Sequence, residues 1–181
     1  DTRYFDELLE RIKVIRTSER MAYQKITDIF ITTSVDYDKK SEEAYTFFKI
    51  VQNKLHYAIT GHTAAELIYE RASSEKIHMG LTNWKNSPDG LIYKYDVSIA
   101  KNYLNKDELE KLNNLTNLFL TFAEDEAKER HIMTMTDWIN ATDDILKFRR
   151  KKILKTCGSI SHKQAIQKAE TEYEKFRIIQ D

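Results

Sequence analysis

The sequence contains very few residues that interrupt helices. Four glycines and one proline occur in 181 residues, whereas globular proteins use about 7% glycine and about 5% proline. Glycine supplies the positive φ that many turns need, and proline ends helices, so their scarcity predicts few turns and long helices. Three of these five residues lie between Ser73 and Asp96, which marks that span as the main irregular region.

Other features are scarce as well. The single cysteine, Cys157, cannot form a disulfide within the chain, which favours a reducing compartment. No apolar run approaches the roughly 20 residues that span a bilayer. The first residues also lack the apolar stretch of a signal peptide. These absences argue against a secreted or membrane protein and favour a cytoplasmic one.

Basic and acidic side chains balance, with 29 of each and a net charge of zero. This balance argues against a wholly basic nucleic-acid-binding protein. The sequence also lacks the glycine-rich loops that bind nucleotide phosphates and the Gly-x-Ser-x-Gly motif of esterases. We therefore expect no cofactor, and an enzyme is the less favoured interpretation.

Apolar residues recur at three- and four-residue steps along most of the chain, a pattern typical of amphipathic helices. We predict an all-α protein, a single domain over residues 1–181 formed by a bundle of five to six longer helices. The capping residues that mark helix starts are Ser41, Thr63, Asn105, Thr134 and Ser161. The predicted helices cover residues 3–33, 41–60, 63–72, 105–130, 134–157 and 161 onward, with a short helix over 96–104 capped by Asp96.

Residues 73–95 form a predicted irregular insertion. Ser87-Pro88-Asp89-Gly90 is a strong turn signal, and its apolar flanks make a small β-hairpin an alternative. The chain begins just before one helix and stops within another. Because natural domains usually keep polar tails, we expect this chain to be a piece of a longer protein.

A conflict in the first predicted helix suggests a polar site. Its apolar seam, continued in steps of 3.5 residues from Phe5 to Ile15, places Glu19 in the next core position. A carboxylate that faces a core is costly unless a cation or hydrogen-bond donors satisfy it. A buried ion pair, or a seam that opens to solvent there, is the structural interpretation. The functional interpretation is a polar site formed by Arg16, Glu19, Arg20, Tyr23, Gln24, Gln52, His56, Glu66 and Lys101.

Metal binding has only weak support in the sequence. His56, His62 and Glu66 could hold a metal ion, but no His-Glu-x-x-His motif or cysteine cluster accompanies them. Asp36 and Asp38 are two residues apart, as in some metal-dependent nucleases and in many ordinary loops. We therefore predict no metal site.

Positive charge is concentrated near the C-terminus. Residues 147–168 contain eight Lys or Arg side chains and no Asp or Glu. Lys147, Lys151 and Lys155 would form a row on the predicted helix, and together with Arg150 they are the candidates for contact with nucleic acid. A solvated helix face that complements the negative end of the helix dipole is the structural alternative.

Several strings along the chain resemble the RhuM family of virulence-associated proteins. The strings are residues 4–12, 15–20 and 23–28, Asp36-Tyr37-Asp38, Val51-Gln52-Asn53-Lys54-Leu55-His56, Thr63-Ala64-Ala65-Glu66, Met79-Gly80-Leu81-Thr82, residues 99–104 and Met133-Thr134-Met135-Thr136-Asp137-Trp138. The resemblance implies a bacterial protein of pathogenicity islands or restriction-modification loci. It also implies that a DNA-binding-like segment precedes this helical part. It supplies no reaction.

Two functions follow as hypotheses. The leading one is a non-enzymatic regulatory module that forms homo-oligomers or binds a protein partner, with DNA contact in the full-length protein and no membrane association. The alternative is a metal-dependent nuclease or another phosphodiester-acting effector. Its acid-base or metal-binding candidates are Glu19, Asp28, Asp36, Asp38 and His56, and its phosphate-binding candidates are Arg16, Arg20 and Lys54.

Overall fold

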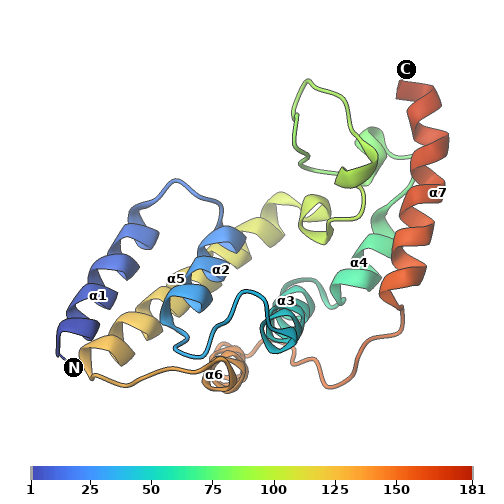
Figure 1. The fold of residues 1–181 in the computed structure, drawn as a ribbon. Coiled ribbons are helices and arrows are strands. Elements are labelled where there is room, and N and C mark those ends of the chain that lie inside the picture. The colour runs from blue at the N-terminus through green and yellow to red at the C-terminus, as the bar shows by residue number, and fades with distance from the viewer. Residues whose placement is uncertain (1, 181) are drawn as a thin grey trace. The chain divides into compact units, whose positions relative to one another are not determined.

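The computed structural model describes residues 2–180, and within them the all-α prediction is confirmed (Figure 1). The described chain has seven α-helices, slightly more than the predicted five to six longer ones. They are α1 (Thr2–Thr17), α2 (Ala22–Thr33), α3 (Glu42–Thr60), α4 (Ala64–Arg71), α5 (Lys106–Lys128), α6 (Met135–Phe148) and α7 (His162–Gln180). Three short 3-10 helices lie between α4 and α5: η1 (Ile77–Gly80), η2 (Lys94–Asp96) and η3 (Ala100–Tyr103).

The helix starts lie where the capping residues predicted them. Thr63 and Glu66 form a reciprocal capping box at α4, and Thr134 and Asp137 form one at α6. Asn105 and Glu108 exchange hydrogen bonds of 2.9 Å at the start of α5. The same exchange between Ser161 and Gln164 precedes α7, and the Ser41 hydroxyl accepts from the third residue of α3. Side chains therefore satisfy backbone N–H groups that a helix start leaves without partners.

The prediction of one continuous helix over residues 3–33 is wrong, because residues 18–21 are not helical and separate α1 from α2. Ser18 donates its hydroxyl to the Ile15 carbonyl at 2.9 Å, and Lys25 donates to the Arg16 carbonyl at 3.0 Å. These bonds satisfy carbonyls at the end of α1. Met21 is extended, with φ −67° and ψ 154°, and starts α2. Glu19 lies in the break and is exposed, so the expectation that it faces the core is also wrong.

The hairpin considered for residues 73–95 is not present, since residues 2–180 contain no strand and only an isolated bridge between Ser34 and Met133. The two flanks of the turn are joined by the side chain of buried Asp96 and not by the backbone hydrogen bonds of a hairpin. Its two carboxylate oxygens accept from the backbone N–H groups of Lys85 at 3.1 Å and Tyr93 at 2.8 Å. Asp96 therefore joins the two flanks of the turn and ends η2. The short helix predicted over 96–104 is reduced to η3, Ala100–Tyr103, and Asp96 does not cap it.

The sixth helix ends nine residues earlier than predicted, at Phe148 instead of residue 157. Arg150 adopts the left-handed conformation, with φ 57°. The Arg150 N–H donates to the Lys147 carbonyl and the Lys151 N–H donates to the Leu146 carbonyl, at 3.0 and 2.9 Å. This is a Schellman motif with arginine where glycine is usual. Lys147, Lys151 and Lys155 consequently do not form a row on one helix.

The described residues group into two compact units, which alternate along the chain. Unit 1 comprises residues 1–55 and 109–153, and unit 2 comprises residues 56–108 and 154–181. The prediction of one single domain stays a prediction.

The core of unit 1 is an aromatic cluster. The Phe30 ring of α2 contacts Phe47 of α3, Phe119 of α5 and Trp138 of α6, with centroid separations of 5.2, 6.1 and 5.1 Å. Trp138 is fully buried, and its indole N–H donates to the Thr33 hydroxyl at 2.7 Å. One ring cluster thus joins four helices, and edge-to-face contacts of this kind stabilise beyond the area that they bury.

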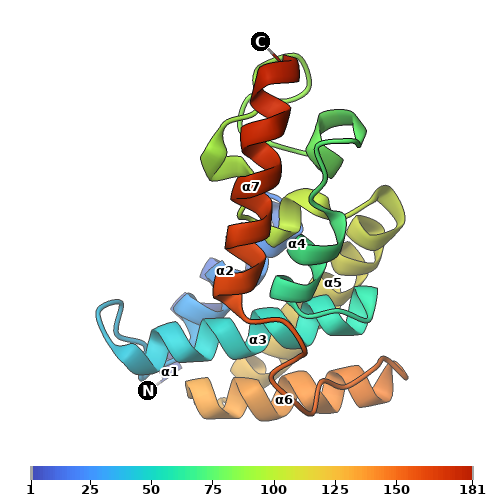
Figure 2. The same cartoon turned by 90° about the vertical axis from the view of Figure 1, so that its right-hand side faces the viewer.

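In unit 2, α4 and α7 lie side by side, as the two ribbon views agree (Figure 2). Ala165, Ala169, Tyr173 and Phe176 form the buried stripe of α7. The turn over residues 84–96 is attached to this helix, because Tyr173 and Gln180 both donate to the Ile92 carbonyl, at 3.1 and 3.0 Å. Buried Trp84 closes the turn with an indole hydrogen bond of 2.9 Å to the Gly90 carbonyl.

The left-handed arginine at the end of α6 gives a test of the fold. Arg150→Gly should raise the free energy of unfolding by about 1 kcal/mol relative to Arg150→Ala, because a Cβ is disfavoured in this conformation and glycine is not. Urea unfolding followed by circular dichroism measures the difference. Arg150→Ala controls for the lost charge, and equal stability of the two variants would contradict the assigned helix end.

Candidate functional site

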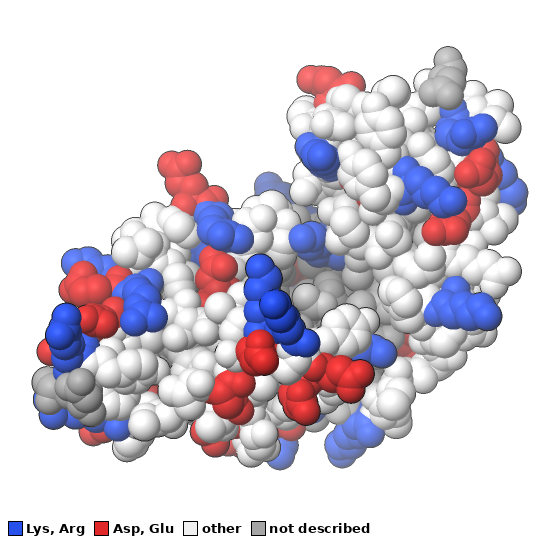
Figure 3. Space-filling model, in the orientation of Figure 1, with Lys and Arg blue, Asp and Glu red and all other residues white. Residues whose placement is uncertain are grey.

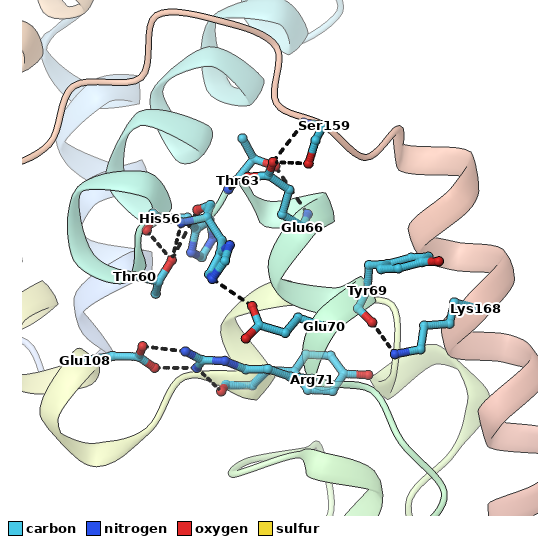
Figure 4. A network of polar contacts seen from close by, with 12 residues as sticks. His56, Thr60, Thr63, Glu66, Tyr69, Glu70, Arg71, Glu108, Ser159 and Lys168 are labelled. Atoms are coloured by element: carbon cyan, nitrogen blue, oxygen red, sulfur yellow. Dashed lines mark hydrogen bonds and ion pairs between the residues drawn. The ribbon is translucent and has the colours of Figure 1, made fainter.

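Unit 2 contains a network of polar side chains around α4, and two predicted site residues, His56 and Glu66, belong to it (Figure 4). At the start of α4, one Glu66 oxygen accepts from the Thr63 backbone N–H at 2.7 Å. The other oxygen accepts from the Ser159 N–H at 2.8 Å and from the Ser159 hydroxyl at 2.7 Å. The capping carboxylate of α4 therefore also holds the loop that precedes α7.

The loop before α7 lies close against the start of α4, and its hydrogen bonds change the pKa of Glu66. A Cβ on Gly158 would lie 2.7 Å from the Thr63 methyl group, and Gly158 has φ +85°. Burial raises the pKa of Glu66, but the hydrogen bonds from Ser159 and Thr63 outweigh it and lower the pKa from 4.5 to about 2. The carboxylate is thus held ionised by fixed donors, as in a structural cap, and is a poor acid or base near neutral pH.

At the other end of α4, Arg71 forms a bidentate ion pair with Glu108 of α5. The two N–O distances are 2.5 and 2.6 Å, and Glu108 is buried. Arg71 also donates to the Tyr103 carbonyl at 2.9 Å. Glu108 is at the same time the capping glutamate of α5. The planar guanidinium of α4 therefore binds η3 through the Tyr103 carbonyl and the first turn of α5 through the Glu108 carboxylate.

The histidines of this region have separate environments. His56, half-buried on α3, has its pKa lowered from 6.5 to about 4 by burial, against an opposing effect of the Glu108 charge. His62 instead contacts Glu70, with Nε2 2.7 Å from the carboxylate. Within residues 2–180, no group of three or more His, Cys, Asp or Glu side chains could hold a metal ion.

The predicted polar site draws its residues from both units. Unit 1 contains Arg16, Glu19, Arg20, Tyr23, Gln24 and Gln52, and unit 2 contains His56, Glu66 and Lys101. Arg16 pairs with Glu124 at 2.8 Å, and Arg20 pairs with Asp28 at 3.3 Å. Gln24 accepts the Met21 backbone N–H at the start of α2, at 3.2 Å. Gln52 is exposed, while Tyr23 and Lys101 are half-buried. A site formed by these nine residues stays a prediction.

The remaining candidates for phosphodiester chemistry also have structural contacts, all within unit 1. Lys54 pairs with Asp143 at 2.8 Å and thereby joins α3 to α6. Asp36 accepts the Met135 backbone N–H at 2.9 Å at the start of α6. Asp38 accepts the Lys40 backbone N–H at 3.0 Å. These partners explain the residue types without a reaction.

The candidate basic residues near the C-terminus do not share one helix. Lys147, Arg150 and Lys155 are exposed, and Lys151 is half-buried. Lys147 lies in the last turn of α6, and Arg150 and Lys151 belong to the Schellman turn of unit 1. Lys155 belongs to unit 2, where Lys168 donates to the Tyr69 carbonyl. Blue and red side chains are interspersed over the face that Figure 3 shows. Their role in nucleic-acid contact stays a prediction.

Sequence reasoning missed a groove on unit 1, between the end of α5 and the exposed side of α6. Its volume is about 340 Å³, and it has an apolar floor and an acidic edge. The lining residues are Phe122, Glu126, Ile132, Met133, Asp137, Asn140, Ala141, Asp144 and Ile145. A signal was present in the sequence, because α6 carries a second apolar stripe, Ala141, Ile145 and Phe148, beside the buried stripe of Trp138, Thr142 and Leu146.

The model of the virulence protein RhuM family matches residues 1–181. The chain belongs to the RhuM family. No curated protein and no solved structure gave a significant match to it. Among the described residues of this RhuM chain, no helix is long and apolar enough to cross a membrane.

The histidine on α3 predicts a pH dependence. Since the pKa of His56 is about 4 in the folded chain and 6.5 is its ordinary value, the unfolded chain binds the proton more readily. Stability should therefore fall as the pH drops from about 6.5 to about 4. His56→Gln should reduce this loss, measured as urea midpoints across the pH range. His162→Gln, at an exposed histidine that begins α7, is the control and should leave the loss unchanged.

The bidentate pair predicts a large loss of stability. Arg71→Ala should lower the free energy of unfolding by about 3 kcal/mol, because it leaves the buried Glu108 carboxylate without its cation. Adding Glu108→Gln should cost less than the two single losses combined. Lys94→Ala, which breaks an exposed 3.8 Å pair with Glu170 in the same unit, should change stability by less than about 0.5 kcal/mol. Equal losses for Arg71→Ala and Lys94→Ala would contradict the structural role of the pair.

Proposed function

We propose that this RhuM chain is a non-enzymatic interaction module that self-associates or binds a protein partner within a DNA-associated bacterial protein of the cytoplasm. The observation that carries the proposal is the groove on unit 1, which exposes apolar side chains beside acidic ones at the surface. Surfaces of this kind are typical of protein-binding sites, because exposed apolar patches cost free energy unless a partner covers them.

The contacts of the charged side chains also support this proposal. Four of the candidate residues each form an ion pair or a hydrogen bond within their own unit: Arg16, Arg20, Lys54 and Glu66. Catalytic groups instead need to converge on a space where substrate atoms can sit. No observation in the described residues favours the nuclease alternative. DNA contact through Lys147, Arg150, Lys151 and Lys155 in the full-length protein remains part of the proposal.

The proposed self-association has a direct test. Size-exclusion chromatography with light scattering, run from about 1 to about 300 µM, should show a mass above that of the 21.4 kDa chain, since weak specific interfaces have dissociation constants in the micromolar range. The mass should rise with concentration. A monodisperse monomer across the whole range would contradict the homo-oligomer and leave only a different protein partner.

A further inference from the structure

The exposed side of α6 carries a continuous stripe that is polarised in charge. Asp137, Asn140, Asp144 and Phe148 form one row at three- and four-residue steps. Buried Ala141 and half-buried Ile145 lie in the adjacent row, so all six share one face of the helix. All but Phe148 line the groove. The groove end of the stripe is acidic, since Glu126 of α5 adds to Asp137 and Asp144.

The other end of the stripe projects from the surface and is basic. Phe148 is the last residue of α6 and is 83% exposed, whereas phenylalanine side chains are usually buried in folded proteins. Lys147, Arg149, Arg150, Lys151 and Lys152 surround it in sequence, and no acidic residue lies between Asp144 and the end of unit 1 at Ile153. The Schellman motif holds Arg150 and Lys151 against the end of α6.

We infer that the groove binds the Phe148 segment of a second copy of this chain. The two α6 helices would lie antiparallel, so that each Phe148 ring enters the apolar floor of the other copy's groove. The basic residues around each ring then face Asp144 and Glu126 of the other copy. Because the groove and the ring lie on one helix face, a two-fold axis satisfies both contacts at once.

Charge complementarity decides in favour of a second copy. An antiparallel pairing places the acidic end of one stripe against the basic end of the other, whereas a parallel pairing would place like charges together. The inference rests on the self-association proposed above and assigns it to a particular surface.

The first experiment removes the ring. Phe148→Ser should raise the dimer dissociation constant by about 30-fold or more, as expected for an aromatic residue at the centre of an interface. Tyr45→Ser is the matched control, because Tyr45 is a 73% exposed aromatic on α3 of the same unit. It should leave the dissociation constant unchanged. Sedimentation equilibrium measures both constants, and circular dichroism shows that both variants are folded.

The second experiment exchanges the charges. Asp144→Lys and the double variant Arg149→Glu/Lys152→Glu should each weaken self-association, because each places like charges across the two-fold axis. An equimolar mixture should restore a heterodimer with affinity close to that of the wild type, since both reciprocal contacts become attractive again. No contact within one chain can explain such a rescue.

The outcomes distinguish this inference from the proposed function. A monomeric wild type overturns this inference and the self-association on which it rests, and it leaves binding of a different protein partner as the proposed function. A wild-type dimer that persists with unchanged affinity in Phe148→Ser, or a mixture that fails to restore binding, overturns the surface and leaves the function standing. If Arg149→Glu/Lys152→Glu abolishes retention of a DNA duplex and leaves the dimer intact, the basic segment binds nucleic acid, and the inference is overturned in favour of that partner.

Discussion

The free backbone N–H groups at helix starts are the constraint around which this chain is organised. With four glycines and one proline, the chain relies on side chains to begin its helices, and two of the capping glutamates do more than cap. Glu66 also binds Ser159, and Glu108 also binds Arg71. Each such carboxylate fixes a helix start and a distant segment together. Acidic residues that suggest chemistry in the sequence are therefore largely used for architecture.

Most of the fold could be predicted because its signals are local. The boxes at Thr63, Asn105, Thr134 and Ser161 each involve residues three apart, and their geometry follows from helix spacing alone. The break after α1 and the end of α6 have no such signal. Lys25 reaches back nine residues to the Arg16 carbonyl, and Arg150 takes a conformation usually left to glycine. The apolar periodicity alone therefore does not give these helix boundaries.

The site was harder to predict than the fold for a related reason. Spacing predicted that Glu66 caps α4, but not that Ser159, 93 residues away, binds its second oxygen. The Arg71–Glu108 pair likewise joins residues 37 apart. The groove on unit 1 differs, since a second apolar stripe on α6 indicates it in the sequence. The lining residues from outside α6, which are Phe122 and Glu126 of α5 and the segment around Ile132, required the structure.

The alternation of the two units along the chain also constrains how the protein is made. Unit 1 receives its aromatic core from α2, α3, α5 and α6, and the residues of unit 2 lie partly between them in sequence. The second stretch of unit 1 must therefore be synthesised as far as Trp138 before the ring cluster can form. Unit 2 additionally needs α7, which is synthesised later still. Neither half can be cut out as one uninterrupted fragment. Nascent chains should consequently expose Phe30 and its surroundings until α6 has been synthesised.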